Sequence, residues 1–172
     1  MLFADLQSFV RYLEQSGQLK RVRTEVDPEL EVTEIAQRAL REQGPALLFE
    51  RPKGSSIPLV MNLFGTMERV RAALGREPAE IGHELIQAFQ RVNPPSLRGL
   101  WESRGIIKRA LLTHPQTVRS AQCHDVIEAP DLSALPILKC WPGDAGRFIT
   151  YGMVLTQHPR TRRRNLGLYR LQ

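Results

Sequence analysis

The sequence predicts a mixed α+β fold in which a helix-rich N-terminal part is followed by a long β-hairpin. Three observations lead to this expectation. Apolar residues recur at helical spacing in four segments of the first hundred residues, short apolar runs lie between them, and the last 25 residues hold two strand-like stretches around a polar turn. With 172 residues, 42% of them hydrophobic, the chain can bury a core without a disulfide or a metal.

Four helices are predicted in this N-terminal part, three of them opened by a capping residue and each closed by glycine or proline. They are expected over residues 6–16, from Pro28 to Gly44, over residues 67–74 and from Pro78 to Val92. Asp5 is the expected cap of the first helix and Asp27 that of the second. Four apolar residues of the fourth helix are expected to face inward, namely Ile81, Leu85, Phe89 and Val92.

Short strands are predicted between these helices. The stretch LKRVRTEV, residues 19–26, is one, and the runs ALLFE and PLVMNLF are expected to be a hairpin or neighbouring strands, since turn-forming residues separate them. No glycine-rich phosphate loop follows a strand, so residues 1–100 are predicted to form an α+β domain and not a βαβ repeat. Residues 101–122 have a weak pattern, with a helical fragment around IIKRALL, and we expect a connector there.

Residues 123–172 are predicted to form a second, β-rich part. A strand is expected at residues 125–128, turns at Pro130 and Pro136, and a long hairpin from the stretches FITYGMVLT and NLGLYRLQ. The polar segment QHPRTRRR joins the two strands of the hairpin. The chain has no internal repeat or low-complexity tract, which excludes solenoids and disordered scaffolds.

Positive charge is concentrated at the end of the sequence. Residues 1–144 contain 18 basic and 18 acidic side chains, whereas residues 145–172 contain six arginines and no acid. Four of these arginines lie in the predicted turn, at position 160 and at positions 162–164. Such a cluster can bind a phosphate, line a nucleic-acid groove or form a solvated turn. A fourth interpretation is that its acidic partners lie in further chain.

The composition favours a soluble protein from a reducing compartment. The N-terminus is amphipathic and no apolar stretch approaches 18 residues, so neither secretion nor membrane spanning is expected. Cys123 and Cys140 fit neither a disulfide framework nor a zinc module, and Cys123 and His124 would point to opposite faces of a strand. The histidines lack metal-ligand spacing and are expected to be structural or exposed: His83, His114, His124 and His158.

The last predicted strand, NLGLYR, carries the side chains with the most specific chemistry. The amide oxygen of Asn165 suits Mg²⁺ or Mn²⁺, and Arg170 offers a planar fork that binds a carboxylate through two hydrogen bonds. Strand alternation places Asn165 with Gly167 and Arg170 on the opposite face. A single site that uses both therefore requires a bulge or twist, which we expect at Gly167. The alternative is an edge hairpin in which the arginine makes a salt bridge.

Several motifs in the same order give the whole chain a resemblance to one protein family. They are DLQSFVRYLEQSGQLKRV, VDPELEVTEIAQRAL, GPALLFERPKG and VMNLFGTMERVRAALG, followed by CHDVIE, LPIL, CWPGDAGRFITYG and RNLGLYR. The chain resembles the UbiD family of decarboxylases, which use prenylated FMN. This resemblance implies a non-oxidative decarboxylase whose residues 123–172 begin a split β-barrel domain that binds the flavin.

The resemblance also implies roles for individual residues. Asn165 would be a ligand of the divalent metal, usually Mn²⁺, that bridges to the cofactor phosphate, with K⁺ as a second candidate ion. Leu168, which stands where isoleucine is commoner, Tyr169 and Arg170 would line the prenylated FMN. Arg170 would also hold the substrate carboxylate, and Thr150 would contact the cofactor. An acidic side chain from later in the family sequence would return the proton after carbon dioxide leaves.

Substrate, partners and location follow from the same resemblance. The first expected substrate is 3-polyprenyl-4-hydroxybenzoate of ubiquinone synthesis, and the alternative is a naphthoate of menaquinone synthesis. A flavin prenyltransferase would supply the cofactor to a cytoplasmic homo-oligomer, or to one at the inner face of the cell membrane. Because family members continue for some three hundred residues, the 172 residues are expected to be a catalytically inert fragment.

Two functions of other classes remain as alternatives. The arginine-rich hairpin could be part of a non-catalytic nucleic-acid-binding module, although few aromatic residues near it could stack on bases. The chain could also be a stand-alone assembly partner of a longer enzyme. Salt-dependent oligonucleotide binding would favour the first alternative and a stable complex with the enzyme would favour the second.

Overall fold

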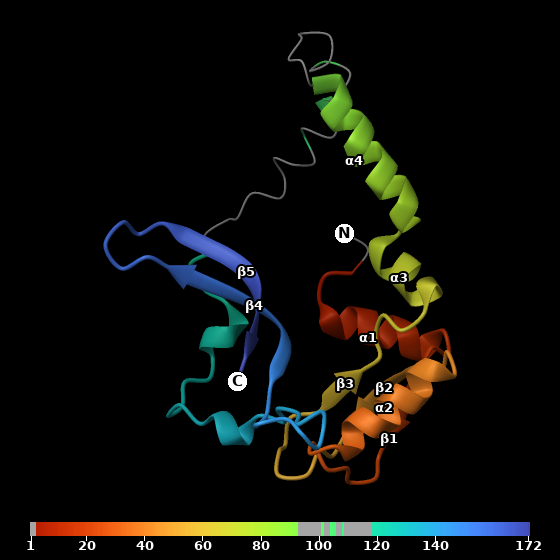
Figure 1. Cartoon of the computed structure of the whole chain (residues 1–172), viewed down its shortest axis with the longest axis vertical. Coiled ribbons are helices and arrows are strands. Elements are labelled where there is room, and N and C mark those ends of the chain that lie inside the picture. Colours follow the sequence, from red (N-terminus) through yellow and green to blue (C-terminus); the bar gives the residue numbers. More distant parts are fainter. Residues whose placement is uncertain (1–2, 93–100, 102–103, 106–107, 109–117) are drawn as a thin grey trace. The chain divides into compact units, whose positions relative to one another are not determined.

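The computed structural model describes residues 3–92, 101, 104, 105, 108 and 118–172 (Figure 1). Contacts between residues divide the chain into two compact units. One unit joins Phe3–Arg69 with Asp131–Gln172, and the other contains the described residues of Val70–Pro130. The first unit holds all the described strands and every site residue that the sequence predicted.

A three-stranded sheet forms the centre of the first unit. Its strands, in spatial order, are β1 (Leu19–Val22), β2 (Ala46–Phe49) and β3 (Leu59–Met61). β3 runs antiparallel to β2, which confirms the predicted pairing of the two apolar runs. β1 runs parallel to β2, with Leu19 opposite Ala46. Because parallel neighbours need a crossover connection, this part contains one βαβ unit, although not a repeat of such units.

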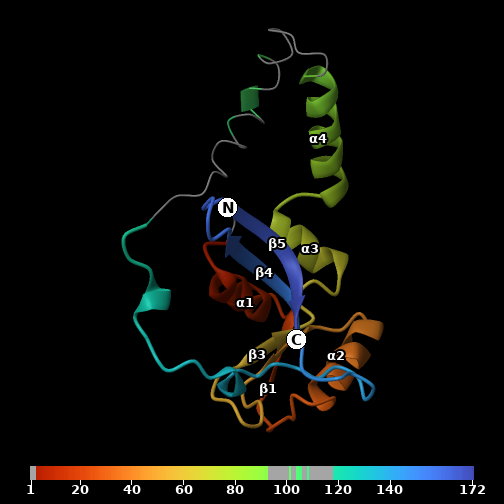
Figure 2. The ribbon, with the colours of Figure 1, turned by 60° about the vertical axis from the view of Figure 1, so that its left-hand side comes forward.

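Helices cover both faces of this sheet (Figure 2). α2 (Glu31–Arg41) packs on one face, in a cluster of buried residues made by Val26, Val32, Ala36, Leu47 and Phe49. Leu48 points to the opposite face, because side chains alternate along a strand. There it borders a groove of about 280 Å³ together with Leu6 and Val10 of α1 (Leu6–Gln15). The small core therefore lies mainly between α2 and the sheet.

The first helix confirms its predicted caps. The Ser8 backbone N–H donates to the Asp5 carboxylate at 2.7 Å, and the Asp5 backbone N–H donates to the Ser8 hydroxyl at 3.2 Å. Gly17 follows the helix with φ of 72°, a left-handed conformation that favours glycine. Phe9 and Leu13 are the buried residues of this helix. Asp5 and Gly17 thus set its limits, as the sequence predicts.

The second helix begins later than predicted, because the segment before it has other partners. Its N-cap is Leu30, with φ of 70° and no side-chain cap. The Asp27 carboxylate accepts instead from the Glu29 backbone N–H and from Lys53 Nζ, each at 2.9 Å. The Leu30 backbone N–H donates to the Lys139 carbonyl at 2.9 Å. The prediction that Asp27 caps this helix is therefore wrong, and Pro28 lies outside the helix.

A buried arginine fixes the connection between β3 and α3 (Met67–Leu74). Arg69 is 1% exposed and donates to three oxygens at 3.2 Å: the Leu63 carbonyl, the Asn62 carbonyl and Oε1 of Gln18. Its burial lowers the pKa of the guanidinium. A Cβ at Gly65 would collide with the Asn62 side chain, so a larger residue there would have to displace that side chain. Sequence reasoning did not single out Arg69, since its pattern is that of an ordinary helical charge.

The second unit contains α4 (Pro78–Val92), whose ends agree with the prediction. Its Leu85 is 57% exposed and its Phe89 is 70% exposed, so the expectation that they face inward is wrong. The predicted helical fragment around IIKRALL lies almost entirely outside the described residues. Among the helices that the structure describes, none combines the length and the apolar character needed to cross a bilayer.

The segment from residue 118 to residue 148 is mostly irregular. A short 3-10 turn, Gln122–His124, precedes the predicted strand at residues 125–128, which is not formed. Val126 and Ile127 there are 70% and 89% exposed and have no neighbouring strand among the described residues. A second 3-10 turn, Leu132–Ala134, leads to an isolated bridge between Leu138 and Phe148.

The predicted hairpin at the end of the chain is present. β4 (Ile149–Gln157) and β5 (Arg164–Leu171) form a two-stranded antiparallel sheet that extends away from the turn between them (Figure 1). Met153 lies opposite Leu168, and Thr156 lies opposite Asn165. This hairpin carries all the residues for which a role in a site is expected.

Candidate functional site

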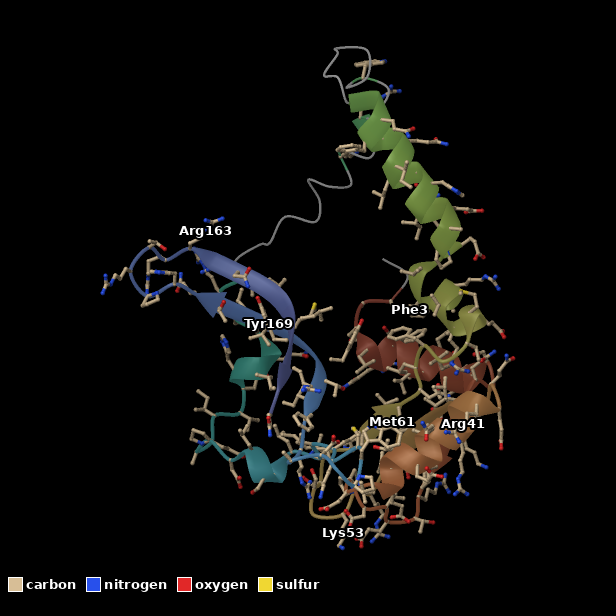
Figure 3. All side chains as sticks on the ribbon, in the orientation of Figure 1. Phe3, Arg41, Lys53, Met61, Arg163 and Tyr169 are labelled. Atoms are coloured by element: carbon tan, nitrogen blue, oxygen red, sulfur yellow. The ribbon has the colours of Figure 1, made fainter. Side chains whose placement is uncertain are left out.

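The face of β5 that carries Asn165 is ordered by Tyr169. Asn165 Nδ2 donates to the Tyr169 hydroxyl at 3.2 Å, which confirms that these two side chains share a face. Between them, a Cβ at Gly167 would lie 2.6 Å from Cε2 of Tyr169. Gly167 therefore lets the tyrosine ring lie along the strand toward Asn165. Figure 3 shows Tyr169 along β5, away from the turn that carries Arg163.

Arg170 lies on the other face of β5, as strand alternation requires. Its guanidinium carbon lies 4.7 Å from the centroid of the Phe148 ring, in a cation–π contact. The Phe148 backbone N–H donates to the Leu138 carbonyl at 2.9 Å, and this hydrogen bond holds the backbone that carries the ring. Arg170 itself remains exposed and forms no ion pair with an acid in the described part of the chain. Its hydrogen-bonding edge is available to a ligand.

The prediction of a bulge at Gly167 is wrong, and a bulge lies in the opposite strand instead. Pairing along β5 is regular from Arg164 to Tyr169, so nothing bends the strand at Gly167. The irregularity lies between Ile149 and Gly152, where two residues of β4, Thr150 and Tyr151, oppose Arg170 alone. An extra residue of this kind twists a strand and re-aims side chains. It brings Thr150 beside Arg170 but leaves Asn165 and Arg170 on opposite faces.

The face of the hairpin that carries Arg170 is otherwise apolar and exposed. Two cross-strand pairs build it, Met153 with Leu168 and Leu155 with Leu166. Their exposures are 74% for Met153, 64% for Leu168, 65% for Leu155 and 62% for Leu166. An apolar surface of this extent typically marks a contact with another protein segment or a ligand. The predicted flavin-lining residue Leu168 lies in this surface, whereas Tyr169 lies on the other face.

An open hollow of about 650 Å³ lies at the closed end of the hairpin. It is lined by Thr156, Gln157, His158, Thr161, Arg163, Arg164 and Asn165. Asn165 and Arg164 belong to opposite faces of β5, so the hollow wraps around the end of the sheet. Of the residues predicted for the site, only Asn165 borders it.

The donors in this hollow fit a phosphate better than a divalent metal. A Mn²⁺ or Mg²⁺ site needs several oxygen or nitrogen ligands together. In the described part of the chain, no group of three or more histidine, cysteine, aspartate or glutamate side chains could hold a metal ion. The lining residues of the hollow include no carboxylate and two arginines. These residues alone therefore do not complete the predicted Mn²⁺ site, whereas arginine is well suited to phosphate.

A second cavity, of about 720 Å³, lies at the open end of the hairpin. Most of its lining is apolar, with Leu132, Leu135, Pro136, Ile137, Ile149 and Leu171 among the lining residues. The Ser55 hydroxyl donates to the Ala134 carbonyl at 2.7 Å, and Arg147 donates to the Ile137 carbonyl at 3.0 Å. Lys53 at its rim is paired with Asp27, which raises the pKa of the lysine. Sequence reasoning missed this cavity, because its walls come from three distant segments.

Two profiles of one protein family match the sequence. Residues 10–89 match the N-terminal domain of 3-octaprenyl-4-hydroxybenzoate carboxy-lyase, and residues 116–172 match the Rift-related domain of the same enzyme. Both domains carry the family name UbiD. Together the two matches leave only the first nine residues and residues 90–115 unmatched.

Solved structures of two enzymes are similar to this chain. One is an evolved dimeric form of the UbiD-class enzyme HmfF from Pelotomaculum thermopropionicum in complex with prFMN, with 29% identity and a TM-score of 0.67 over 99% of this chain. The other is vanillic acid decarboxylase from Sedimentibacter hydroxybenzoicus in its closed form, with 26% identity and a TM-score of 0.73 over 99% of this chain. This chain covers 36% of the first structure and 35% of the second, so it spans about a third of their length.

Proposed function

Because this chain belongs to the UbiD family of decarboxylases, we propose that it contributes to a non-oxidative decarboxylase that uses prenylated FMN. The observation that carries the proposal is the placement of Arg170. Its exposed guanidinium makes a cation–π contact with Phe148, lies opposite the bulge at Thr150 and borders an apolar surface. An aromatic acid has a carboxylate, which the guanidinium would bind, and an apolar ring, which the apolar surface would contact.

Arg170 would bind the substrate carboxylate through two parallel hydrogen bonds. The cation–π contact with Phe148 would hold the guanidinium plane in place before the substrate arrives. The apolar side chains of Met153 and Leu168 would exclude water from the reacting ring, and Thr150 would contact the flavin beside Arg170. The electron sink that lets carbon dioxide leave would come from the bound flavin.

The other face of β5 would serve the cofactor's polar end. Asn165 would provide one oxygen ligand to a Mn²⁺ or K⁺ ion near the cofactor phosphate, together with ligands from outside the described residues. Tyr169 would support Asn165 through its hydroxyl, in addition to its expected contact with the flavin. The hairpin, with the apolar face that carries Arg170, would form the first two strands of a split β-barrel. Residues 1–100 would then be the N-terminal domain, residues 101–122 the connector and residues 123–172 the beginning of the barrel.

The proposed substrate is an aromatic or unsaturated acid. The family description favours 3-polyprenyl-4-hydroxybenzoate of ubiquinone synthesis, with a naphthoate of menaquinone synthesis as the alternative. A flavin prenyltransferase would supply the cofactor, and the working enzyme would be a cytoplasmic homo-oligomer, peripheral to the inner membrane face for a polyprenyl substrate. A similar enzyme of this class has been found in a dimeric form and with prFMN, which supports the cofactor and assembly proposals.

The decisive experiment transfers this chain into an active relative. Its 172 residues replace the matching third of vanillic acid decarboxylase, and the chimera is coexpressed with a flavin prenyltransferase. We expect the chimera to carry a modified flavin and to release carbon dioxide from an aromatic acid. Arg170→Ala should lower the rate by on the order of a hundredfold or more, because the carboxylate loses its position. Arg170→Lys should not restore the rate, since lysine cannot form the paired hydrogen bonds.

The matched control is Arg162→Ala, an exposed arginine of the same hairpin that lines neither cavity. Its rate should stay within twofold of the parent chimera. The flavin absorbance of each purified variant separates a folding failure from a loss of chemistry. An Arg170→Ala chimera with bound flavin and full turnover would exclude the role given to this residue.

A further inference from the structure

We infer that the tight turn at Leu30, directly before α2, positions Arg170 for its ligand. The turn acts through Lys139 and Phe148, which lie between the two residues in a continuous chain of contacts. All four belong to the first compact unit. The inference rests on the proposed function in one respect, that Arg170 binds a carboxylate. Leu30 and Glu29 are thus positioning residues and not catalytic ones.

The backbone of the turn at Leu30 is strained. Leu30 has φ of 70° and ψ of −41°, and the Glu31 backbone N–H donates across it to the Glu29 carbonyl at 2.8 Å. These features define a γ-turn of the rare, strained kind. Glycine adopts positive φ readily, whereas leucine does so at a cost in free energy. Strained residues of this kind persist where surrounding contacts hold them, and they are frequent at functional sites.

The contacts that hold this turn come from Lys139. The Leu30 backbone N–H donates to the Lys139 carbonyl at 2.9 Å, and Glu29 pairs with Lys139 in an isolated parallel bridge. Lys139 Nζ also lies 3.1 Å from Oε1 of Glu29, in an ion pair between residues 110 positions apart. The turn therefore offers both a backbone donor and a carboxylate to the same distant residue.

The contacts continue from Lys139 to Arg170. Leu138, next to Lys139, forms an isolated antiparallel bridge with Phe148, whose backbone N–H donates to the Leu138 carbonyl at 2.9 Å. The Phe148 ring in turn lies 4.7 Å from the guanidinium carbon of Arg170. Each step from Leu30 to Arg170 is therefore a covalent neighbour, a backbone hydrogen bond or a ring contact.

The segment that carries these contacts has little regular structure of its own. Residues 135–148, all of which the structure describes, contain no helix and no strand longer than a single bridge. The start of the segment is tied to the loop after β2, where the Ser55 hydroxyl donates to the Ala134 carbonyl at 2.7 Å. Its position is therefore set by contacts with the N-terminal sheet region, and the turn at Leu30 supplies two of them.

The consequence for Arg170 follows from its surroundings. The structure gives its guanidinium a ring contact with Phe148 and, among the described residues, no ion pair with an acid. Two parallel hydrogen bonds to a carboxylate require the guanidinium plane to be oriented. A side chain that is ordered in advance loses less conformational entropy on binding. By fixing the backbone of Phe148, the turn fixes the ring that orients Arg170.

The first experiment follows the side-chain proton signals of Arg170 in the isotope-labelled 172-residue protein by nuclear magnetic resonance. The aromatic ring shifts these signals, and Phe148→Leu gives their position without the ring. Leu30→Pro removes the backbone N–H and cannot adopt a positive φ, so the Arg170 signals should move toward the Phe148→Leu position. Leu30→Gly keeps the N–H and relieves the strain, so the signals should stay at the parent position.

A charge exchange tests the same contacts without altering the backbone of the turn, in case the proline variant fails to fold. Glu29→Lys places positive charge beside Lys139 and should move the Arg170 signals in the same direction by a smaller amount. Adding Lys139→Glu restores opposite charges and should return the signals to the parent position. The matched control is Glu34→Lys, which breaks the exposed ion pair with Arg38 on α2 and should leave the signals unchanged.

The second experiment measures catalysis in the chimera with vanillic acid decarboxylase. Leu30→Pro and Phe148→Leu should each lower kcat/KM for the aromatic acid by about tenfold to a hundredfold, because the guanidinium is misplaced. Leu30→Gly should stay within about twofold of the parent. The flavin absorbance should be equal in all three variants. A residue that only stabilises the fold would lower the melting temperature without moving the Arg170 signals.

Arg170 signals that stay at the parent position in both Leu30→Pro and Glu29→Lys would overturn the inference, as would a charge exchange that fails to restore them. If the signals move as expected but even Arg170→Ala leaves kcat/KM unchanged, the chain of contacts stands and the proposed role of Arg170 fails. A chimera that loses rate in Arg170→Ala but not in Leu30→Pro or Phe148→Leu would keep the proposed function and reject the positioning role.

Discussion

The arginines of the N-terminal sheet region and those of the hairpin differ in their surroundings. Arg21 of β1 bridges Glu14 of α1 and Glu50, which follows β2, with Nη1 2.7 Å from the Glu50 carboxylate. The nearby Arg69 is buried and bound by three neutral oxygens. Arg163 and Arg164 of the hairpin are exposed and lack an acidic partner among the described residues.

Under the proposed function, this difference separates residues that stabilise the fold from residues that would bind a ligand. Arg21 and Arg69 of the sheet region connect helices, strands and loops to one another, so both have partners within the chain. By contrast, Arg163 and Arg164 of the hairpin have no acidic partner among the described residues, and the apolar face beside them is exposed. Under the proposed function, a flavin cofactor would contact those groups.

The largest expected effect contrasts the two regions through apolar residues. Phe49 is fully buried in the cluster beneath α2, whereas Leu166 is 62% exposed on the hairpin. Phe49→Ala should lower the free energy of unfolding by about 3 to 5 kcal/mol, because it leaves a cavity. Leu166→Ala should change it by less than about 0.5 kcal/mol. Chemical denaturation measures both, and similar losses would show that the hairpin face is packed like a core.

The next effect concerns the buried arginine. Arg69→Met keeps much of the apolar volume but removes the three hydrogen bonds to Leu63, Asn62 and Gln18. Carbonyl oxygens left unsatisfied cost about 1 to 3 kcal/mol, so we expect a loss of this size in the free energy of unfolding. Arg164→Met, on the exposed hairpin, is the control and should cause no loss. A stable Arg69→Met protein would show that this network adds little.

A smaller effect on the free energy of unfolding is expected on the face of β5 that carries Asn165 and Tyr169. In Gly167→Ala the new methyl group would meet the Tyr169 ring, which must move away. We expect a loss of about 1 kcal/mol or more from this crowding. The hydrogen bond from Asn165 to Tyr169 should break as well, visible as a changed side-chain amide signal of Asn165. Gly146→Ala meets open space and is the matched control.

The smallest effect is a pH dependence in the sheet region. The Glu29 backbone N–H, followed by Lys53, lowers the pKa of the Asp27 carboxyl below its ordinary value. A lowered folded-state pKa stabilises the fold above the unfolded pKa, and this contribution is lost as the pH falls through the folded value. Asp27→Asn should therefore have a melting temperature that depends less on pH in the acidic range. Equal acid sensitivity of the variant and the parent would contradict this.

Local rules were enough to predict some regular elements of the fold. Asp5 and Gly17 bound α1, and the alternation in NLGLYR gave the faces of β5 correctly. These features depend on neighbours within a few residues, so the sequence displays them directly. The start of α2 was missed because the Leu30 backbone N–H donates to the Lys139 carbonyl, far along the chain.

For the candidate site, the sequence displays residue types but not their arrangement in space. Residue types single out Asn165 and Arg170 as candidates, but the bulge that opposes Arg170 lies in β4 at Thr150, and a register shift between strands has no local signal. The burial of Arg69 could not be predicted from the sequence either, since its partners come from segments that meet only in the folded chain. The exposed side chains of α4 differ from their predicted inward face because amphipathic spacing tells which side is apolar and not what covers it.

The most direct test of the contrast between the two regions is thermal melting of the double variant Arg163→Gln with Arg164→Gln, with and without FMN. Without FMN, its melting temperature should equal or exceed that of the parent, because like-charge repulsion is reduced. With FMN, the parent should gain stability through binding and the variant should gain much less. A variant that melts earlier without FMN, or gains as much from it as the parent, would show that these arginines serve the fold.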